Sequence, residues 1–129
     1  MIFIDSSFYV SLLKKRDSNH RKAVDWWRSL PDDAQKMTSQ AILGEVLTVG
    51  SQRHDRRLAI AFVEEIRAGN TIIVLETAPL VTRAWEIFKK VKSKNISWVD
   101  CYSRAIIEVY KVETVLTFDK DFARLVKPQ

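Results

Sequence analysis

The sequence has little of what disulfides, zinc sites, flexible linkers and membrane spans require. Its single cysteine, Cys101, excludes an internal disulfide and a cysteine-based zinc site. Glycine and proline occur three times each, which argues against long flexible linkers. No apolar run approaches the roughly 20 residues needed to cross a bilayer, and no basic segment followed by a long apolar stretch opens the chain. We therefore expect a cytoplasmic protein with no membrane association.

The length and hydrophobic content are those of one compact domain. The chain has 129 residues, of which 47% are hydrophobic, so a real core can form without covalent staples. No internal repeat or low-complexity segment divides it. We expect a single domain over residues 1–129.

Short apolar segments alternate with segments of helical periodicity. The expected strands are Ile2–Asp5, Lys36–Thr38, Thr71–Leu75 and Thr114–Leu116. The expected helices are Ser7 to about Lys15, His20–Leu30, Ser39 to about Arg53, Asp55–Ala68, Thr77 to about Val91, Ser97 to about Tyr110 and a terminal turn or short helix at Asp119–Leu125. This alternation predicts an α/β fold with a parallel sheet and helices on both faces. The run TIIVL at Thr71–Leu75 is typical of a strand buried on both faces.

Two aspartates directly follow predicted strands. Asp5 ends the first strand, and Asp119 lies just beyond the last one. Aspartate in such a place commonly begins a turn or caps a helix. In parallel sheets, however, ligands bind beyond the carboxyl ends of the strands, so the same two residues are candidates for a site.

Two further carboxylates have both a structural and a functional interpretation. Glu45 shares a helical stripe with Ile42 and Val46, where a carboxylate is unfavourable unless it is paired with an arginine, exposed at the edge, or bound to a cation. Asp100 forms a capping-box pattern with Ser97 and could pair with Arg104, yet it also belongs to a first helical turn that faces the sheet end.

Convergence of four carboxylates would require cations to offset their repulsion. Oxygen-only ligands suit Mg²⁺ or Mn²⁺, and such ions can activate water and stabilise a leaving phosphodiester oxygen. The net charge is +5, with basic runs at Lys14–Arg16, Arg53–Arg57 and Lys89–Lys94. Each run alone is typical of a solvated helix end, but beside an acidic site the three together favour a nucleic-acid substrate.

Four short segments resemble one known family. FIDSS, LGEVLT, SWVDCYS and LTFDKDF are similar, in order and spacing, to the motifs of the PIN domain and more narrowly of VapC-type toxins of type II toxin–antitoxin systems. The resemblance covers nearly the whole chain. It implies a PIN-like three-layer sandwich and an endoribonuclease dependent on Mg²⁺ or Mn²⁺.

The resemblance also implies roles for particular residues. By the match of motifs, the catalytic acids fall on Asp5, Glu45, Asp100 and Asp119. Asp5, Asp100 and Asp119 would hold the first metal, while Glu45 would serve a second metal or the attacking water. Ser6 and Thr117 would support the acids by hydrogen bonds, and Asp121 is a secondary candidate.

Partners and alternatives follow from the same comparison. The resemblance implies an RNA substrate, a VapB-type antitoxin and a homodimer; one of the adjacent Trp26 and Trp27 could be an exposed anchor. Three alternatives remain open: a non-toxin RNA-processing nuclease, a PIN-like module that binds without cutting, and a metal-independent ribonuclease using His20 and His54. No G-x-G-x-x-G or P-loop pattern occurs.

Overall fold

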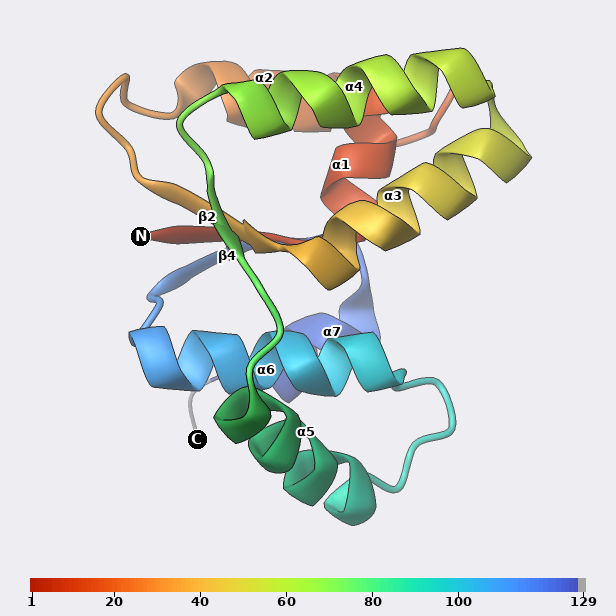
Figure 1. The fold of residues 1–129 in the computed structure, drawn as a ribbon. Helices are drawn as coiled ribbons and strands as arrows, with labels where there is room; N and C mark the ends of the chain where they lie inside the picture. The colour runs from red at the N-terminus through yellow and green to blue at the C-terminus, as the bar shows by residue number, and fades with distance from the viewer. Residues whose placement is uncertain (128–129) are drawn as a thin grey trace.

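The chain folds around a four-stranded, all-parallel sheet with the strand order β3-β2-β1-β4 (Figure 1). The computed structural model describes residues 1–127, so residues 128 and 129 of the expected single domain lie outside the described residues. The strands are β1 (Ile2–Ile4), β2 (Lys36–Ser39), β3 (Ile72–Val74) and β4 (Thr114–Leu116). The helices are α1 (Ser6–Leu13), α2 (His20–Ser29), α3 (Gln40–Arg53), α4 (Arg56–Ala68), α5 (Ala78–Lys90), α6 (Trp98–Tyr110) and α7 (Lys120–Leu125).

The helices form one layer on each face of the sheet, which confirms the predicted sandwich. Helices α1 to α4 cover one face and α5 to α7 cover the other (Figure 1). The central strand β1 serves both layers, because its successive side chains Phe3 and Ile4 point to opposite faces and are both fully buried. Phe8 and Ile42 extend the core on one side, and Ile106 extends it on the other.

Polar caps set where most helices begin, as the sequence predicts. The side chains of Ser39, Asp55 and Thr77 accept a backbone N–H bond at the starts of α3, α4 and α5. Ser97 and Asp100 form the full capping box at the start of α6. The start of α1 differs from expectation: the helix begins at Ser6, and Asp5 occupies the cap position without capping through its side chain. Its carboxylate is thereby free for another role.

One predicted strand forms as expected, but its predicted burial on both faces is wrong. The segment Thr71–Leu75 forms β3, but this strand lies at the edge of the sheet rather than in its centre. Ile72 is 43% exposed and Leu75, just beyond the strand, is 64% exposed. An uninterrupted apolar run indicates burial on both faces only where neighbouring strands and helices cover it, and an edge strand lacks one neighbour. Among the described residues, no helix has the length and apolarity needed to cross a membrane.

Candidate active site

Asp5 lies at the centre of the carboxyl edge of the sheet. It follows the inner strand β1, and its N–H donates to the carbonyl of Leu116 at 3.0 Å, continuing the pairing with β4. The residue is only 3% exposed. Its Oδ2 accepts hydrogen bonds from the hydroxyls of Ser7 and Thr117, each at 2.8 Å. Burial raises the pKa of the Asp5 carboxyl, and these two donors oppose that rise.

Ser7 and Thr117 join the ends of β1 and β4 into one polar network. Their hydroxyls lie 3.1 Å apart, and Ser7 Oγ also accepts from the N–H of Phe118 at 2.9 Å. Thr117 Oγ1 accepts from the N–H of Asp119 at 3.0 Å. Thr117 thus has the supporting position expected of it, whereas Ser7 is a residue that the sequence argument missed. A serine at the second helical position resembles an ordinary capping residue, so its signal was hidden.

Asp119 and Asp100 each cap a helix through one carboxylate oxygen, so the capping bonds do not use the other oxygen. Asp119 Oδ1 caps α7 by accepting the N–H groups of Asp121 and Phe122 at 2.9 and 3.1 Å. Asp100 Oδ2 accepts the N–H of Ser97 at 3.0 Å in the capping box. The predicted capping roles of Asp100 and Asp119 are therefore confirmed. The capping hydrogen bonds also hold the two carboxylates in fixed positions. Asp121 lies in the first turn of α7, beside the same edge.

Glu45 and Asp100 experience the charges of the other acids. Burial is the main cause that raises the pKa of Glu45, and the negative charges of Asp5, Asp100 and Asp119 raise it further. Burial likewise raises the pKa of Asp100, and Asp5 and Asp119 add to the rise. Ser6 donates toward Glu45 and opposes the shift there, so it supports Glu45 as well as neighbouring Asp5. Four carboxylates therefore gather at one edge of the sheet: Asp5 follows β1, Glu45 lies on α3, Asp100 lies on α6, and Asp119 precedes α7.

None of the ion pairs in the described part of the chain involves this cluster. Within residues 1–127, the ion pairs are Arg83 with Glu86 and Glu108, and Arg104 with Glu108. The pairing of Asp100 with Arg104 is thus wrong, because Arg104 reaches Glu108 one turn along α6 at 3.1 Å. Glu45 also has no arginine partner among those pairs. Buried acids of like charge without a cationic partner are the electrostatic setting that a bound divalent ion relieves.

The donor chemistry fits a hard divalent cation, although the side chains do not form a closed ligand set. All four groups offer carboxylate oxygens, the donors that Mg²⁺ and Mn²⁺ prefer. In the part of the chain that the structure describes, no three His, Cys, Asp or Glu side chains converge closely enough to hold an ion as they stand.

The two histidines have separate environments. His20 Nδ1 lies 2.8 Å from the carbonyl of Ser11, and His54 is exposed at the end of α3. Neither histidine is among the groups that perturb the pKa of Asp5, Glu45 or Asp100. The geometry therefore favours the carboxylate cluster over the histidine pair as the reactive centre.

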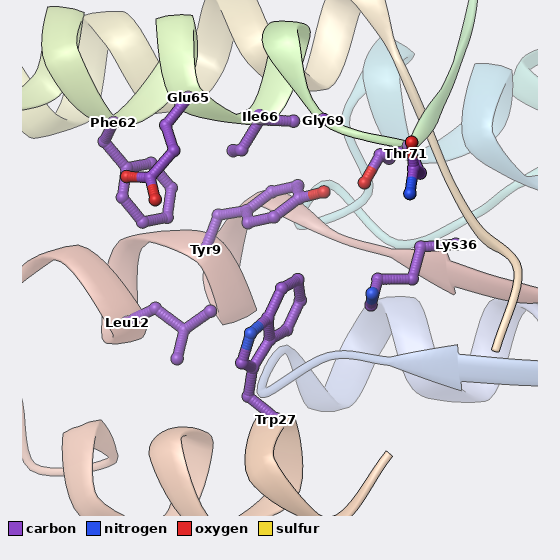
Figure 2. A pocket seen from close by; sticks show the side chains of 10 residues that line it. Tyr9, Leu12, Trp27, Lys36, Phe62, Glu65, Ile66, Gly69 and Thr71 are labelled. Atoms are coloured by element: carbon purple, nitrogen blue, oxygen red, sulfur yellow. The ribbon is translucent and has the colours of Figure 1, made fainter. Parts of the chain in front are cut away.

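A hollow lies between α1, α2 and α4, away from the four acids. Figure 2 shows its lining, a space of about 460 Å³ whose walls include Tyr9, Trp27 and Phe62. The Tyr9 hydroxyl is directed toward Thr71 there and is fully buried. None of the four candidate acids lines this hollow. Of the adjacent tryptophans, Trp27 is half-buried against it, while Trp26 is 36% exposed.

The fold and the acidic edge together define a class of α/β protein with carboxylates gathered beyond the ends of parallel strands. The sequence matches the PIN domain over residues 2–128. It is also 34% identical over 125 residues to the 23S rRNA-specific endonuclease VapC20 of Mycobacterium tuberculosis, covering 95% of this chain and 92% of that protein. The chain belongs to the PIN-domain family, in its VapC-type branch.

Solved structures agree with this assignment. The crystal structure of M. tuberculosis VapC20, described as a sarcin–ricin loop cleaving toxin, superposes with a TM-score of 0.88 at 30% identity, covering 96% of this chain and 94% of that one. Two more distant structures share the fold alone. FitAcB from Neisseria gonorrhoeae has a TM-score of 0.69 at 18% identity and covers 98% of this chain and 93% of its own. VapBC2 from Rickettsia felis, bound to a promoter DNA fragment, has a TM-score of 0.63 at 13% identity, with 97% and 93% covered.

Proposed function

We propose that this protein is a divalent-metal-dependent endoribonuclease that acts in the cytoplasm as the toxin of a toxin–antitoxin pair. The observation that carries the proposal is the gathering of Asp5, Glu45, Asp100 and Asp119 without a cationic partner at the carboxyl edge of the sheet. A VapC-type relative that is named an rRNA endonuclease supports the choice of RNA.

The four acids would have different roles. Asp5, Asp100 and Asp119 would hold Mg²⁺ or Mn²⁺, and Glu45 would serve a second ion or position the attacking water. When bound, the metal supplies activation of water and stabilisation of the charge on the leaving oxygen. Attack of water on the phosphorus would break the bond to the 3′ oxygen, leaving a 5′-phosphate and a 3′-hydroxyl.

The surrounding residues would keep the reactive oxygens in place. Ser7 and Thr117 donate to the same oxygen of Asp5, which leaves Oδ1 available to a ligand. The backbone N–H groups of Ser6 and Ser7 at the start of α1 also stabilise the ionised form of Asp5. Such supporting bonds typically change metal affinity or activity by about 10- to 100-fold when removed.

A cleavage assay tests the proposal. Purified protein is incubated with 23S ribosomal RNA in Mg²⁺, in Mn²⁺ and in EDTA, and the product ends are analysed. We expect 5′-phosphate ends in either metal, and no cleavage in EDTA or with Asp5→Asn. A cyclic phosphate formed in EDTA would favour histidine chemistry instead. RNA binding without cleavage under any condition would favour the PIN-like binding module.

The antitoxin partner has its own candidate site. We propose that a VapB-type antitoxin inserts an apolar side chain into the hollow of Figure 2. The aromatic walls of the hollow support this proposal. Trp27→Ala should weaken co-purification with an antitoxin encoded beside the toxin while leaving RNA cleavage intact.

The homodimer also stays a proposal. Trp85 and Phe88 stack on the outside of α5 with exposures of 51% and 39%, which is unusual for aromatic residues without a partner. Light scattering should detect a dimer for the wild-type protein and a monomer for Trp85→Glu. An unchanged mass for the variant would move the interface elsewhere.

A further inference from the structure

Two basic runs that are far apart in the sequence line one hollow of the surface. Lys14, Lys15 and Arg16 follow the end of α1, and Arg53 and His54 end α3. All five side chains line a hollow of about 880 Å³, larger than the one in Figure 2. Neither run alone indicates a site, but their meeting concentrates positive charge at one place.

The meeting depends on a close approach of three helices. Gly50 lies in the last turns of α3, and a Cβ placed on it would come within 2.9 Å of Leu13 and 3.0 Å of Ala59. The absence of a side chain at Gly50 therefore lets the end of α1 and the start of α4 pack directly on α3. In Figure 1 the end of α3 and the start of α4 meet at the right-hand side. This packing brings Lys14–Arg16 beside Arg53.

Among residues 1–127, the basic side chains of this hollow form no ion pair. The ion pairs within residues 1–127 all involve Arg83 or Arg104, which lie on α5 and α6. Glu65 is the one acidic residue among those that line the hollow, and Leu58 and Phe62 supply apolar wall. Lys15, Arg16 and Arg53 are exposed, so their charged groups can meet a ligand from solvent.

Arg53 connects this hollow to the carboxylates. It also lines a smaller hollow of about 270 Å³ together with Ser6 and Ser7. Ser7 donates directly to Asp5, so the smaller hollow borders the acidic site. Along α3, Arg53 lies eight positions beyond Glu45, which corresponds to about 12 Å along the helix axis.

We propose that this basic hollow, built from Lys14–Arg16 and Arg53–His54, binds the sugar–phosphate backbone of the RNA substrate a few nucleotides away from the bond that is cut. The proposal rests on the ribonuclease function proposed above. The hollow would supply affinity and register, because contacts to phosphates carry no base sequence, while the chemistry stays with the carboxylates.

RNA is favoured over an acidic protein segment by the continuity of the surface. The hollow leads through Arg53 to the edge of the acidic site, where a phosphate must lie during cleavage. Two guanidinium and two ammonium groups that lack ion pairs also match closely spaced phosphates. An acidic polypeptide remains as an outcome of the test.

The experiment compares two charge-matched triple variants. The hollow variant carries Lys15→Gln, Arg16→Gln and Arg53→Gln. The control variant carries Arg28→Gln, Lys111→Asn and Lys127→Gln, which removes the same charge from exposed positions outside the hollow. Asparagine replaces Lys111 because that residue has a left-handed φ of 54°. Circular dichroism first verifies that both variants melt like the wild type.

Binding and cleavage are then measured separately. Affinity for 23S ribosomal RNA is measured over a range of salt concentrations in an Asp5→Asn background, and steady-state cleavage is measured with Asp5 intact. We expect the hollow variant to lower the salt-dependence slope by about 2–3 and to raise Kd about 100- to 500-fold at 0.1 M salt, since each lost contact contributes about 5- to 8-fold. Its KM should rise similarly with kcat unchanged, and a short oligonucleotide containing only the mapped cut site should be cleaved normally. The control variant should shift Kd less than about 3-fold.

The outcomes separate this proposal from the ribonuclease function. Equal salt slopes and equal Kd for the hollow and control variants would overturn the proposal, whether or not RNA is cut. Binding of poly-glutamate, a model acidic polypeptide, is measured for the same variants. If the hollow variant lost poly-glutamate binding but kept its RNA affinity, the proposal would be overturned and the hollow would be assigned to an acidic polypeptide. If wild-type protein cut no RNA but the hollow variant still lost RNA affinity, the binding proposal would hold and the nuclease proposal would fail.

Discussion

Replacing Asp5 with asparagine should change stability in opposite directions with and without metal. Asp5 is 3% exposed, and burying a carboxylate costs several kcal/mol. Two hydroxyl donors at 2.8 Å offset part of this cost, at about 1.5–3 kcal/mol for each bond to a charged group. Asparagine removes the charge and its repulsion with the other acids but retains an acceptor. We expect Asp5→Asn to gain about 1–2 kcal/mol in EDTA at pH 7.

With metal bound, we expect the wild type to be more stable than Asp5→Asn, the reverse of the order in EDTA. An ion present at 100 times its Kd stabilises the folded state by about 2.7 kcal/mol. For a chain of this size, 1 kcal/mol corresponds to about 3–5 °C in Tm, so millimolar Mn²⁺ should raise the wild-type Tm by about 8–13 °C. The Asp5→Asn variant should gain far less and become the less stable protein.

Thermal melts followed by circular dichroism in EDTA and in Mn²⁺ measure both effects. Asp33→Asn, a substitution at an exposed turn residue, serves as the control and should follow the wild type in both buffers. The reasoning is refuted if the wild type shows no shift in Mn²⁺, or if Asp5→Asn shifts as much as the wild type does.

Three further predictions concern other parts of the molecule. Thr117→Val, which loses the donor to Asp5 and the acceptor of the Asp119 N–H, should lower kcat for RNA cleavage about 10- to 100-fold and also lower Tm, and Thr117→Ser should retain both activity and Tm. The hydrogen bond from Arg83 is the main cause that lowers the pKa of Glu108. This ion pair therefore stabilises the folded state at pH values above the ordinary glutamate pKa, and the stabilisation is lost as the pH falls through the lowered pKa. Urea unfolding should therefore show Glu108→Gln to be less stable by about 1 kcal/mol at pH 7, with the difference vanishing as the pH falls through the lowered pKa of Glu108. Gly50→Ala should destabilise the fold by about 1–3 kcal/mol in the same urea assay, because the added methyl group meets neighbouring side chains at 2.9–3.0 Å; an unchanged midpoint would show that the three helices are not tightly packed there.

The parts of the fold that depend on local chemistry were predictable from the sequence. Ser39, Asp55, Thr77 and Ser97 mark helix starts because their side chains satisfy backbone N–H groups within the same turn. Strands β1, β3 and β4 follow from short apolar runs between those helices, whereas β2 (KMTS) contains one apolar residue, Met37. The edge position of β3 did not follow, since strand order depends on long-range pairing that an apolar run does not encode.

The site was predictable to a similar extent. Placement at strand ends and in a first helical turn pointed to Asp5, Asp119 and Asp100, and the interruption of an apolar helical stripe pointed to Glu45. The role of Ser7 was missed, because its bonds to Asp5 and Phe118 cross from β1 to β4 and have no local signature. The basic hollow was missed for the same reason: only the close packing at Gly50 brings Lys15 near Arg53.

The central claim is that Asp5 and its neighbouring acids cut RNA, and sequencing of RNA ends in cells tests it most directly. The wild-type protein and Asp5→Asn are expressed from the same inducible promoter, and all 5′-phosphate ends are mapped shortly after induction. The account predicts new ends at one or a few defined sites, in ribosomal RNA, that appear with the wild type and are absent with Asp5→Asn. Identical end profiles for the two proteins, at equal expression, would contradict it.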